Sequence, residues 1–204
     1  MANLPFELEA GLAARLDRII DSEGKIARAL EALGPVGGRD VALLDAPASR
    51  VASELKGIGA RVSNVPLASP LRLPFADSSL DAIVSLWYGF RGVDASEMVE
   101  ADRVLRPGGR LLIVHDYGRD DVSRLRGDAP EYGPWSRREG PFLRGGFKIR
   151  VLHCWWTFES LDAAQAFLGE AFGSRGLEVA AAMARPRLSW NVAIYHRSRS
   201  EPAA

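Results

Sequence analysis

The chain alternates between short apolar runs and polar turns, and this pattern predicts strands and helices in a layered domain. Residues 80–86 and 111–114 are mainly apolar, and between them Met98, Ala101 and Leu105 recur at helical spacing. Short apolar runs of this kind are typical of strands that are covered on both faces. Two such strands joined by a helix predict a right-handed crossover within a parallel sheet.

The helix between these strands has recognisable ends. Asp94, with Glu97 three residues later, is a capping pair that opens the helix. Residues 107–109, Pro-Gly-Gly, end it, because proline lacks an amide donor and glycine tolerates a positive φ. We therefore expect a strand, a loop, a helix, a tight turn and a second strand in this order.

The rest of the chain follows the same two periodicities. Helical spacing predicts amphipathic helices within residues 1–35, 49–58 and 158–173, and a short helix at 120–125. Strands are predicted at 41–44, 61–65, 149–156 and 188–196. Glycine, proline and charge predict a long loop excursion at 126–147, and a polar tail follows at 197–204. Together these elements predict a single three-layer α/β domain over residues 1–204.

The composition narrows the range of functions. Basic and acidic residues number 26 each, so no whole-molecule field favours nucleic acid or an anionic membrane. The single cysteine, Cys154, excludes an internal disulfide and a cysteine-rich metal site, and we expect no bound metal. No apolar run reaches the roughly 18 residues of a membrane-spanning helix, so we expect a soluble, cytoplasmic protein.

Two stretches of the chain resemble a known family. Leu-Pro-Phe-Ala-Asp-Ser-Ser-Leu-Asp at 73–81 and Arg-Val-Leu-Arg-Pro-Gly-Gly-Arg-Leu at 103–111 look like the second half of a class I S-adenosylmethionine (SAM) dependent methyltransferase of the type 11-like kind. The resemblance runs from about Val41 to His196. It implies a Rossmann-like fold, with a mostly parallel sheet and an antiparallel last strand. SAM is the cofactor that it implies, if the chain binds any.

The half of the domain that holds SAM in this family departs from the family pattern. Members follow the first strand with an acidic residue and a glycine-rich loop, because the backbone must approach the methionine and ribose closely. Here Asp45 matches the acidic residue, but no glycine follows it before Gly57. Pro66 stands where the family has the ribose carboxylate, and Ser69 where it has a further aspartate. The positions that the resemblance assigns to the cofactor are Asp45, Ala46, Pro47, Ser49, Ser69, Trp87 and Tyr88.

The first half of the domain is also short. Val65 is followed almost at once by Leu73, so we predict a sheet that lacks one strand and one helix of the family. Our first hypothesis is a methyltransferase-like protein with lost or altered SAM binding, which acts by binding a ligand, a second copy of itself or an active homologous enzyme. The alternative is an active SAM-dependent methyltransferase that uses Asp45 and a rebuilt donor pocket on an unknown small-molecule acceptor.

The candidate catalytic residues are His115, Asp116 and Tyr117, which follow the predicted strand 111–114. A histidine beside a carboxylate is suited to act as a general base toward a methyl acceptor. The other interpretation is a hydrogen-bonded core histidine and an aspartate that caps a helix.

Aromatic residues follow the other central strand. Trp87, Tyr88 and Phe90 come directly after the run 80–86. Because the carboxyl ends of parallel strands meet at one edge of the sheet, we expect these side chains to line one cleft with His115 or to fill it.

A weaker alternative rests on basic residues late in the chain. The basic residues in or beside the loop are Arg137, Arg138, Arg144 and Lys148. Trp135 and Phe142 are interleaved among them, and cationic and stacking side chains together are typical of surfaces that bind nucleic acid or another anionic ligand. A solvated excursion or an oligomer contact is the other interpretation.

Overall fold

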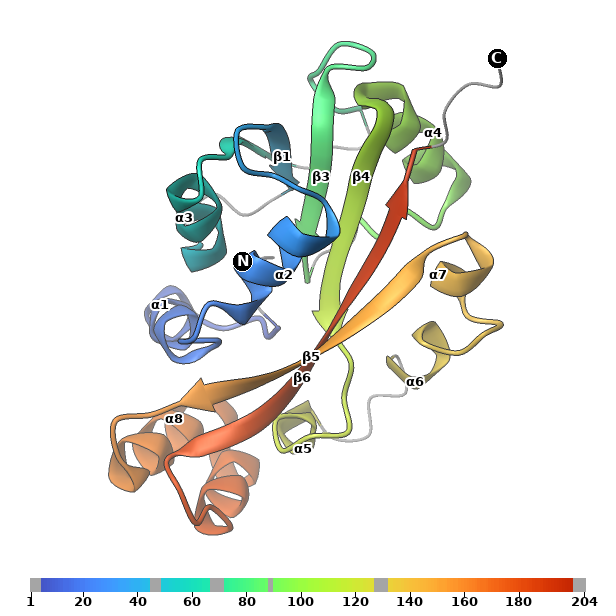
Figure 1. Ribbon diagram of the computed structural model, residues 1–204. Helices are drawn as coiled ribbons and strands as arrows, with labels where there is room; N and C mark the ends of the chain where they lie inside the picture. Colours follow the sequence, from blue (N-terminus) through green and yellow to red (C-terminus); the bar gives the residue numbers. More distant parts are fainter. Residues whose placement is uncertain (1–4, 45–48, 67–71, 88–89, 127–131, 200–204) are drawn as a thin grey trace.

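The computed structural model describes residues 5–44, 49–66, 72–87, 90–126 and 132–199, and within them the chain forms one six-stranded sheet (Figure 1). The strands are β1 (Asp40–Leu44), β2 (Arg61–Val65), β3 (Leu80–Leu86), β4 (Leu105–Asp116), β5 (Lys148–Thr157) and β6 (Arg187–Ser198). Their order across the sheet is β2-β1-β3-β4-β6-β5. The first four run parallel, whereas β6 is antiparallel to both β4 and β5. The predicted α/β fold with a mostly parallel sheet and an antiparallel last strand is confirmed.

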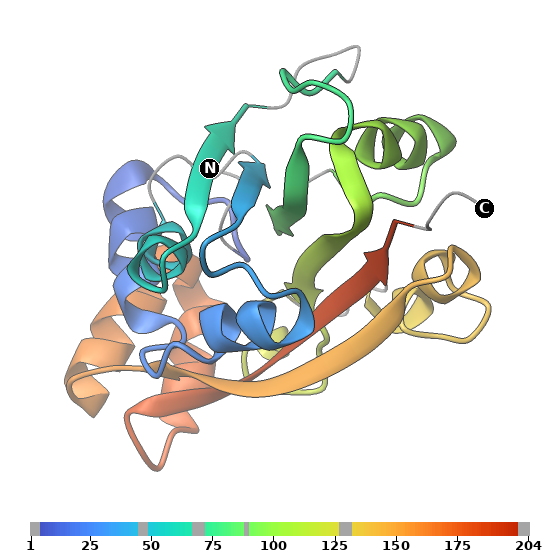
Figure 2. The ribbon, with the colours of Figure 1, turned by 45° about the horizontal axis from the view of Figure 1, so that its top comes forward.

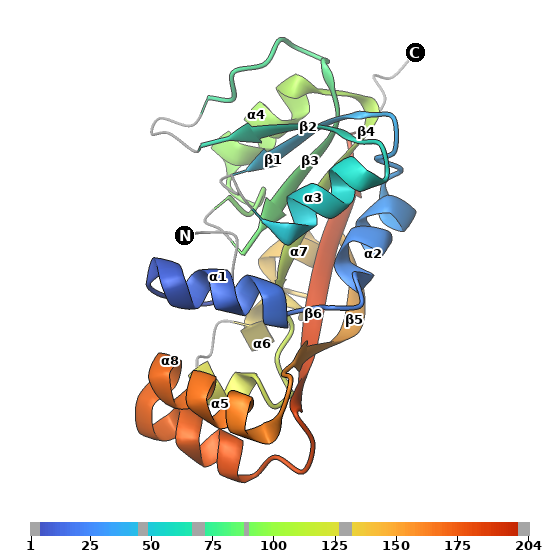
Figure 3. The same ribbon diagram turned by 90° about the vertical axis from the view of Figure 1, so that its left-hand side faces the viewer.

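Helices cover both faces of this sheet. They are α1 (Ala10–Ile19), α2 (Lys25–Leu33), α3 (Arg50–Gly57), α4 (Ala95–Val104), α5 (Ser123–Arg126), α6 (Tyr132–Trp135), α7 (Pro141–Arg144) and α8 (Leu161–Ala181). Buried residues of α1, α2, α3 and α8 share one core, and those of α4, α6 and α7 share a second. Figures 2 and 3 show α2 and α3 on one face of the sheet and α4 on the other. The domain therefore has three layers.

The residues of each central strand alternate between the two cores. Val41 and Leu43 of β1 belong to the core under α2 and α3, whereas Ala42 and Leu44 belong to the core under α4. The residues of β3 and β4 alternate in the same way. Covering on both faces explains why these strands are unbroken apolar runs in the sequence.

The two family-like stretches hold each other in place. The Arg103 guanidinium of α4 donates to the backbone oxygens of Leu73 and Phe75, at 3.0 and 2.8 Å, and to the Asp77 carboxylate at 2.8 Å. The buried Glu100 accepts the Leu73 N–H at 2.6 Å and bonds to Arg103, which lowers the pKa of Glu100. These side chains fix the turn before β3 against α4, so this part of the resemblance serves the fold.

The first helical segment of α8 ends at Gly173 as predicted, because Gly173 is non-helical with φ 61° and ψ −140°, and a second segment that the sequence did not predict follows directly to Ala181. Two other details of the predicted elements are wrong. Asp94 stands at the N-cap of α4 without a capping bond from its side chain, and Glu97 instead accepts the Gly92 N–H at 2.7 Å. The predicted excursion is not a loop throughout, because α6 and α7 lie within residues 132–147.

The join between β2 and β3 is short. Its described residues, 66 and 72–79, contain no helix and no strand. Residues 67–71 lie outside the described residues, so the missing family unit stays a prediction. Among the helices that the structure describes, none is both long and apolar enough to cross a membrane.

Candidate functional site

The carboxyl ends of β1, β3 and β4 meet at one edge of the sheet, and this edge is the candidate site. β1 and β3 are neighbours in the sheet. The strand that follows β1 in the chain, β2, lies on one side of this pair, and the strand that follows β3, β4, lies on the other. Open α/β sheets bind ligands outside the carboxyl ends of the strands at such a switch point. The described residues that the sequence assigned to this edge are Ser49, Trp87, Phe90, His115, Asp116 and Tyr117. Figures 1 and 3 show α1 lying beyond the edge.

A buried carboxylate is the centre of one side of this edge. Asp116, the last residue of β4, accepts the indole N–H groups of Trp87 and Trp190 on Oδ1, at 2.8 and 3.0 Å. Its Oδ2 pairs with the Arg126 guanidinium at 2.5 Å. Burial raises the pKa of Asp116 to about 6, although Arg126 and the two indole donors act in the opposite direction. We call these four residues the Asp116 cluster.

Trp87 is held in an unusual backbone conformation within this cluster. Its φ of 47° lies in a region that bulky residues rarely adopt, at a cost of about 1–3 kcal/mol. The Trp87 N–H donates to the Val114 oxygen at 2.9 Å, and the ring stacks on Trp190 with centroids 5.4 Å apart. The side chain is only 9% exposed. The indole that the resemblance assigned to the cofactor is therefore packed in the core and bonded to Asp116.

The segment before α1 closes over the Asp116 cluster. The Arg126 guanidinium lies over the Phe6 ring, 4.0 Å from its centroid, and donates to the Pro5 backbone oxygen. Phe6 in turn makes edge contacts with Trp156 and Phe172, at centroid distances of 5.6 and 4.9 Å. Side chains from distant parts of the chain thus fill this side of the edge.

The amino end of α3, which follows β1, also has internal partners. Ser49 caps the helix, because its Oγ accepts the Ala52 N–H at 3.1 Å. The Asp17 carboxylate of α1 accepts the Arg50 N–H at 3.2 and 3.4 Å, and the Arg50 guanidinium donates to the Ile20 oxygen at 2.5 Å. Carboxylates are favourable at a helix amino end, where N–H groups lack helical partners. In this protein α1 supplies that carboxylate.

His115 lies on the opposite face of the sheet from Asp116. It is 7% exposed, and its ring meets Trp135 edge-on at 4.6 Å. Trp135 belongs to the core that also buries Phe90 and packs against Tyr117, whereas Trp87 belongs to the other core.

The catalytic role expected of His115, Asp116 and Tyr117 stays a prediction, with His115 and Asp116 on opposite faces of the sheet. The expectation that Trp87 and His115 share one cleft is wrong. The reason is that β4 extends to Asp116, two residues beyond the predicted strand, and successive residues of a strand point to opposite faces.

Several predicted site residues are not part of the described structure. They are Asp45, Ala46, Pro47, Ser69 and Tyr88. Among the residues that are described, no group of three or more histidine, cysteine, aspartate or glutamate side chains lies close enough to hold a metal ion.

The basic residues late in the chain are exposed, whereas their aromatic neighbours in the sequence are buried. Arg137, Arg138, Arg144 and Lys148 are all exposed. Trp135 is 8% exposed and Phe142 is fully buried, and Phe142 stacks on Tyr195 with ring centroids 3.9 Å apart. The two aromatic rings therefore belong to the core and do not lie beside the cations as a stacking platform.

Sequence reasoning missed Arg126 and Phe6 as members of this edge. Nothing in their sequence spacing connects them to β4, because they meet Asp116 and Trp156 only after the chain has folded. The sequence did indicate that Trp190 is buried, because it is one of the apolar positions in the alternating run 188–194.

Residues 22–113 match the family model described as "Methyltransferase domain". A search of curated proteins finds the ubiquinone/menaquinone biosynthesis C-methyltransferase UbiE of Dinoroseobacter shibae, 39% identical over 69 residues. In both comparisons the chain is similar to methyltransferases over less than half of its length. The matched segment is 33% of this chain and spans 27% of the length of that enzyme.

Solved methyltransferase structures have the same fold over most of the chain. A candidate type II methyltransferase from Anaeromyxobacter dehalogenans has a TM-score of 0.55 at 18% identity, covering 88% of this chain and 97% of that one. A candidate methyltransferase of an antibiotic biosynthesis pathway from Anabaena variabilis has a TM-score of 0.56 at 13% identity, covering 88% and 98%. At these identities the likeness concerns the fold alone.

Proposed function

We propose that this methyltransferase-like protein does not bind SAM in the usual way and acts by binding. Its partner is a small-molecule ligand, a second copy of the chain or an active homologous enzyme. The observation that carries the proposal is the Asp116 cluster, in which the protein's own donors and rings occupy the carboxyl edge of the sheet.

The other described groups of this edge support the same proposal. The Ser49 hydroxyl and the Arg50 N–H, at the start of the helix after β1, already have partners in Ala52 and Asp17. A cofactor placed there would compete with these bonds, and Pro66 offers its ribose no carboxylate. Each buried polar group left unpaired costs about 1–3 kcal/mol, and two such losses weaken binding by about 30-fold to 10,000-fold.

Isothermal titration with SAM, and with its demethylated product, tests the proposal directly. At high protein concentration we expect no saturable heat in the low micromolar range, with binding in the millimolar range or absent. A dissociation constant of a few micromolar would overturn the proposal.

A second candidate function is an active SAM-dependent methyltransferase acting on a small-molecule acceptor. It is favoured by the family match over residues 22–113, which includes Asp45. In this case Asp45 would hold the ammonium group of SAM, since a carboxylate at a strand end is suited to that charge.

The same titration separates the two candidates with a pair of variants. Asp45→Ala removes the carboxylate in question, and Asp162→Ala removes an exposed carboxylate on α8 as the control. If SAM binds tightly and Asp45→Ala alone weakens it by about tenfold or more, the enzyme candidate stands. If none of the three proteins binds SAM, the binding-protein proposal stands.

A further inference from the structure

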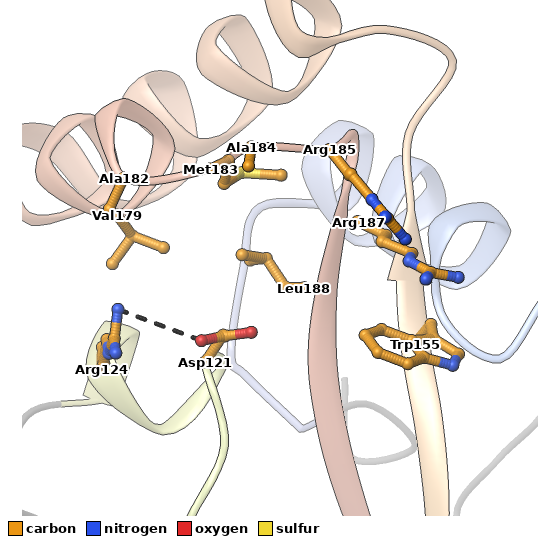
Figure 4. A pocket seen from close by; sticks show the side chains of 10 residues that line it. All are labelled: Asp121, Arg124, Trp155, Val179, Ala182, Met183, Ala184, Arg185, Arg187 and Leu188. Carbon is orange, nitrogen blue, oxygen red and sulfur yellow. Dashed lines mark ion pairs between the residues drawn. The ribbon is translucent and has the colours of Figure 1, made fainter.

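A hollow at the outer end of the β5–β6 pair has a charge surplus and an apolar floor. It has a volume of about 260 Å³ and lies between α5, the end of α8 and the first residues of β6. Figure 4 shows Arg185 and Arg187 side by side near Trp155, with Asp121 and Arg124 across Leu188 from them. Ligand sites for larger organic molecules span about 300–1,000 Å³, so this hollow suits a smaller one.

The charges around the hollow are unbalanced. Three arginines and one aspartate line it, a surplus of two positive charges. The Asp121 carboxylate is largely engaged, because its Oδ2 accepts the hydroxyl and the N–H of Ser189 at 2.6 and 3.0 Å. Arg124 approaches Asp121 only to 3.9 Å, and Arg185 forms no ion pair with any carboxylate that the structure describes.

Backbone bonds order the turn that carries the two neighbouring arginines. The Arg187 N–H donates to the Arg185 oxygen at 2.7 Å, and the Phe158 N–H donates to the Pro186 oxygen at 2.8 Å. Proline restricts φ at the centre of this turn. The Arg187 guanidinium lies over the Trp155 ring, 4.3 Å from its centroid. The Trp155 ring restrains the Arg187 guanidinium before binding, so this cation loses less entropy when it captures an anion.

The floor of the hollow is apolar. Val179 and Leu188 are 6% and 2% exposed, and the partly buried Met183 packs beside them. A methionine side chain adapts to ligands of different shape because it is unbranched and flexible.

We propose that this hollow binds a small organic anion, whose carboxylate or phosphate head meets Arg185 and Arg187 and whose apolar body covers Met183 and Val179. Guanidinium groups bind both heads through two parallel N–H···O bonds. The hollow shares no residue with the Asp116 cluster, and the proposal does not depend on whether SAM binds.

The three methionines of the chain provide a site-specific test. In protein labelled with ¹³C at the methionine methyl groups, octanoate and octyl phosphate are titrated separately while the methyl resonances are followed by NMR. We expect the Met183 resonance to shift with saturation for at least one of the two probes, while Met98, which packs in the other core, stays unmoved. The probe with the lower dissociation constant identifies whether the site prefers a carboxylate or a phosphate group. If Met183 does not shift with either probe, or Met98 shifts equally, the proposal is wrong.

Matched ligands and variants separate charge from apolar contact. 1-Octanol keeps the apolar body and inorganic phosphate keeps the charge, and each should bind at least about tenfold more weakly than the preferred probe. The double variant Arg185→Gln, Arg187→Gln should lose at least about tenfold in affinity, because both guanidinium groups are gone. The control Arg175→Gln, at an exposed position on α8, should bind as the wild type does. Equal affinity for octanol, or for the double variant, would overturn the proposal.

Discussion

At Asp116 the protein buries a carboxylate almost completely and surrounds it with three donors. Two indole N–H groups and the Arg126 guanidinium satisfy the charge, yet burial still raises the pKa of Asp116 to about 6. Removing one partner of a buried ion pair is costly, because the other charge is then left without compensation. The cluster therefore makes stability depend on the ionisation of one residue.

We predict that acidification stabilises the wild type relative to Asp116→Asn. The folded-state pKa of about 6 lies above the ordinary value of 3.8, so the folded protein binds more protons between these values. The free energy of unfolding, relative to the variant, should rise by about 3 kcal/mol as the pH falls from 6.5 to 3.5, and stay level above pH 6.5. Urea denaturation of both proteins across this range measures it. A pH-independent difference would contradict the pKa shift.

At the scale of single elements, α8 is interrupted by a non-helical residue, Gly173. It folds back on itself at Gly173, and Figure 3 shows its two halves side by side. Gly176 lies where the halves touch, because a Cβ added there would stand 1.9 Å from the Leu168 backbone oxygen. A methyl group at position 176 therefore fits only if the two halves of α8 move apart.

We predict that Gly176→Ala lowers the free energy of unfolding by about 1–3 kcal/mol or more, since the two halves must separate. Gly11→Ala is the matched control, because Gly11 lies in α1 and a Cβ there meets nothing within 4 Å. Alanine has the higher helix propensity, so the control should be stabilised by up to about 1 kcal/mol. Urea unfolding of the two variants compares them. Equal and small effects at both positions would mean that the halves of α8 are not in close contact.

At the scale of the whole molecule, charge is balanced and the late basic residues lack a stacking surface. Basic and acidic residues number 26 each. Trp135 and Phe142, which the sequence interleaves with the cations, are buried beside His115 and Tyr195. Proteins that bind single strands combine a positive groove with exposed rings, and here the rings are not exposed.

We predict that the protein does not bind nucleic acid with useful affinity. Fluorescence anisotropy with labelled single-stranded DNA and RNA should show no saturable change at micromolar protein in low salt. Saturable binding that weakens steeply with salt would contradict this, because that slope reports cations displacing the counterions of phosphate. Loss of that binding in Arg137→Gln, Arg138→Gln would then assign it to this part of the chain.

The sequence by itself determined the elements and most of their order. Apolar runs at 80–86 and 111–114 predict two of the central strands, because a strand that is buried on both faces needs apolar side chains at nearly every position. Helical spacing predicts α2 and α3 for the same reason, and Ser49 stands where the helix cap forms. The motifs 73–81 and 103–111 indicate the fold correctly because their residues, such as Arg103, hold that fold together.

Only the tertiary structure decided which side chains meet at the carboxyl edge. β4 continues for two residues beyond the apolar run 111–114, and this continuation places His115 and Asp116 on opposite faces of the sheet. The apolar run does not indicate that the strand continues. Arg126 and Phe6 join Asp116 and Trp156 from distant parts of the chain, and the burial that raises the pKa of Asp116 exists only once they do. Periodicity reports the surroundings of a residue along its own element, whereas a site depends on partners that other elements supply.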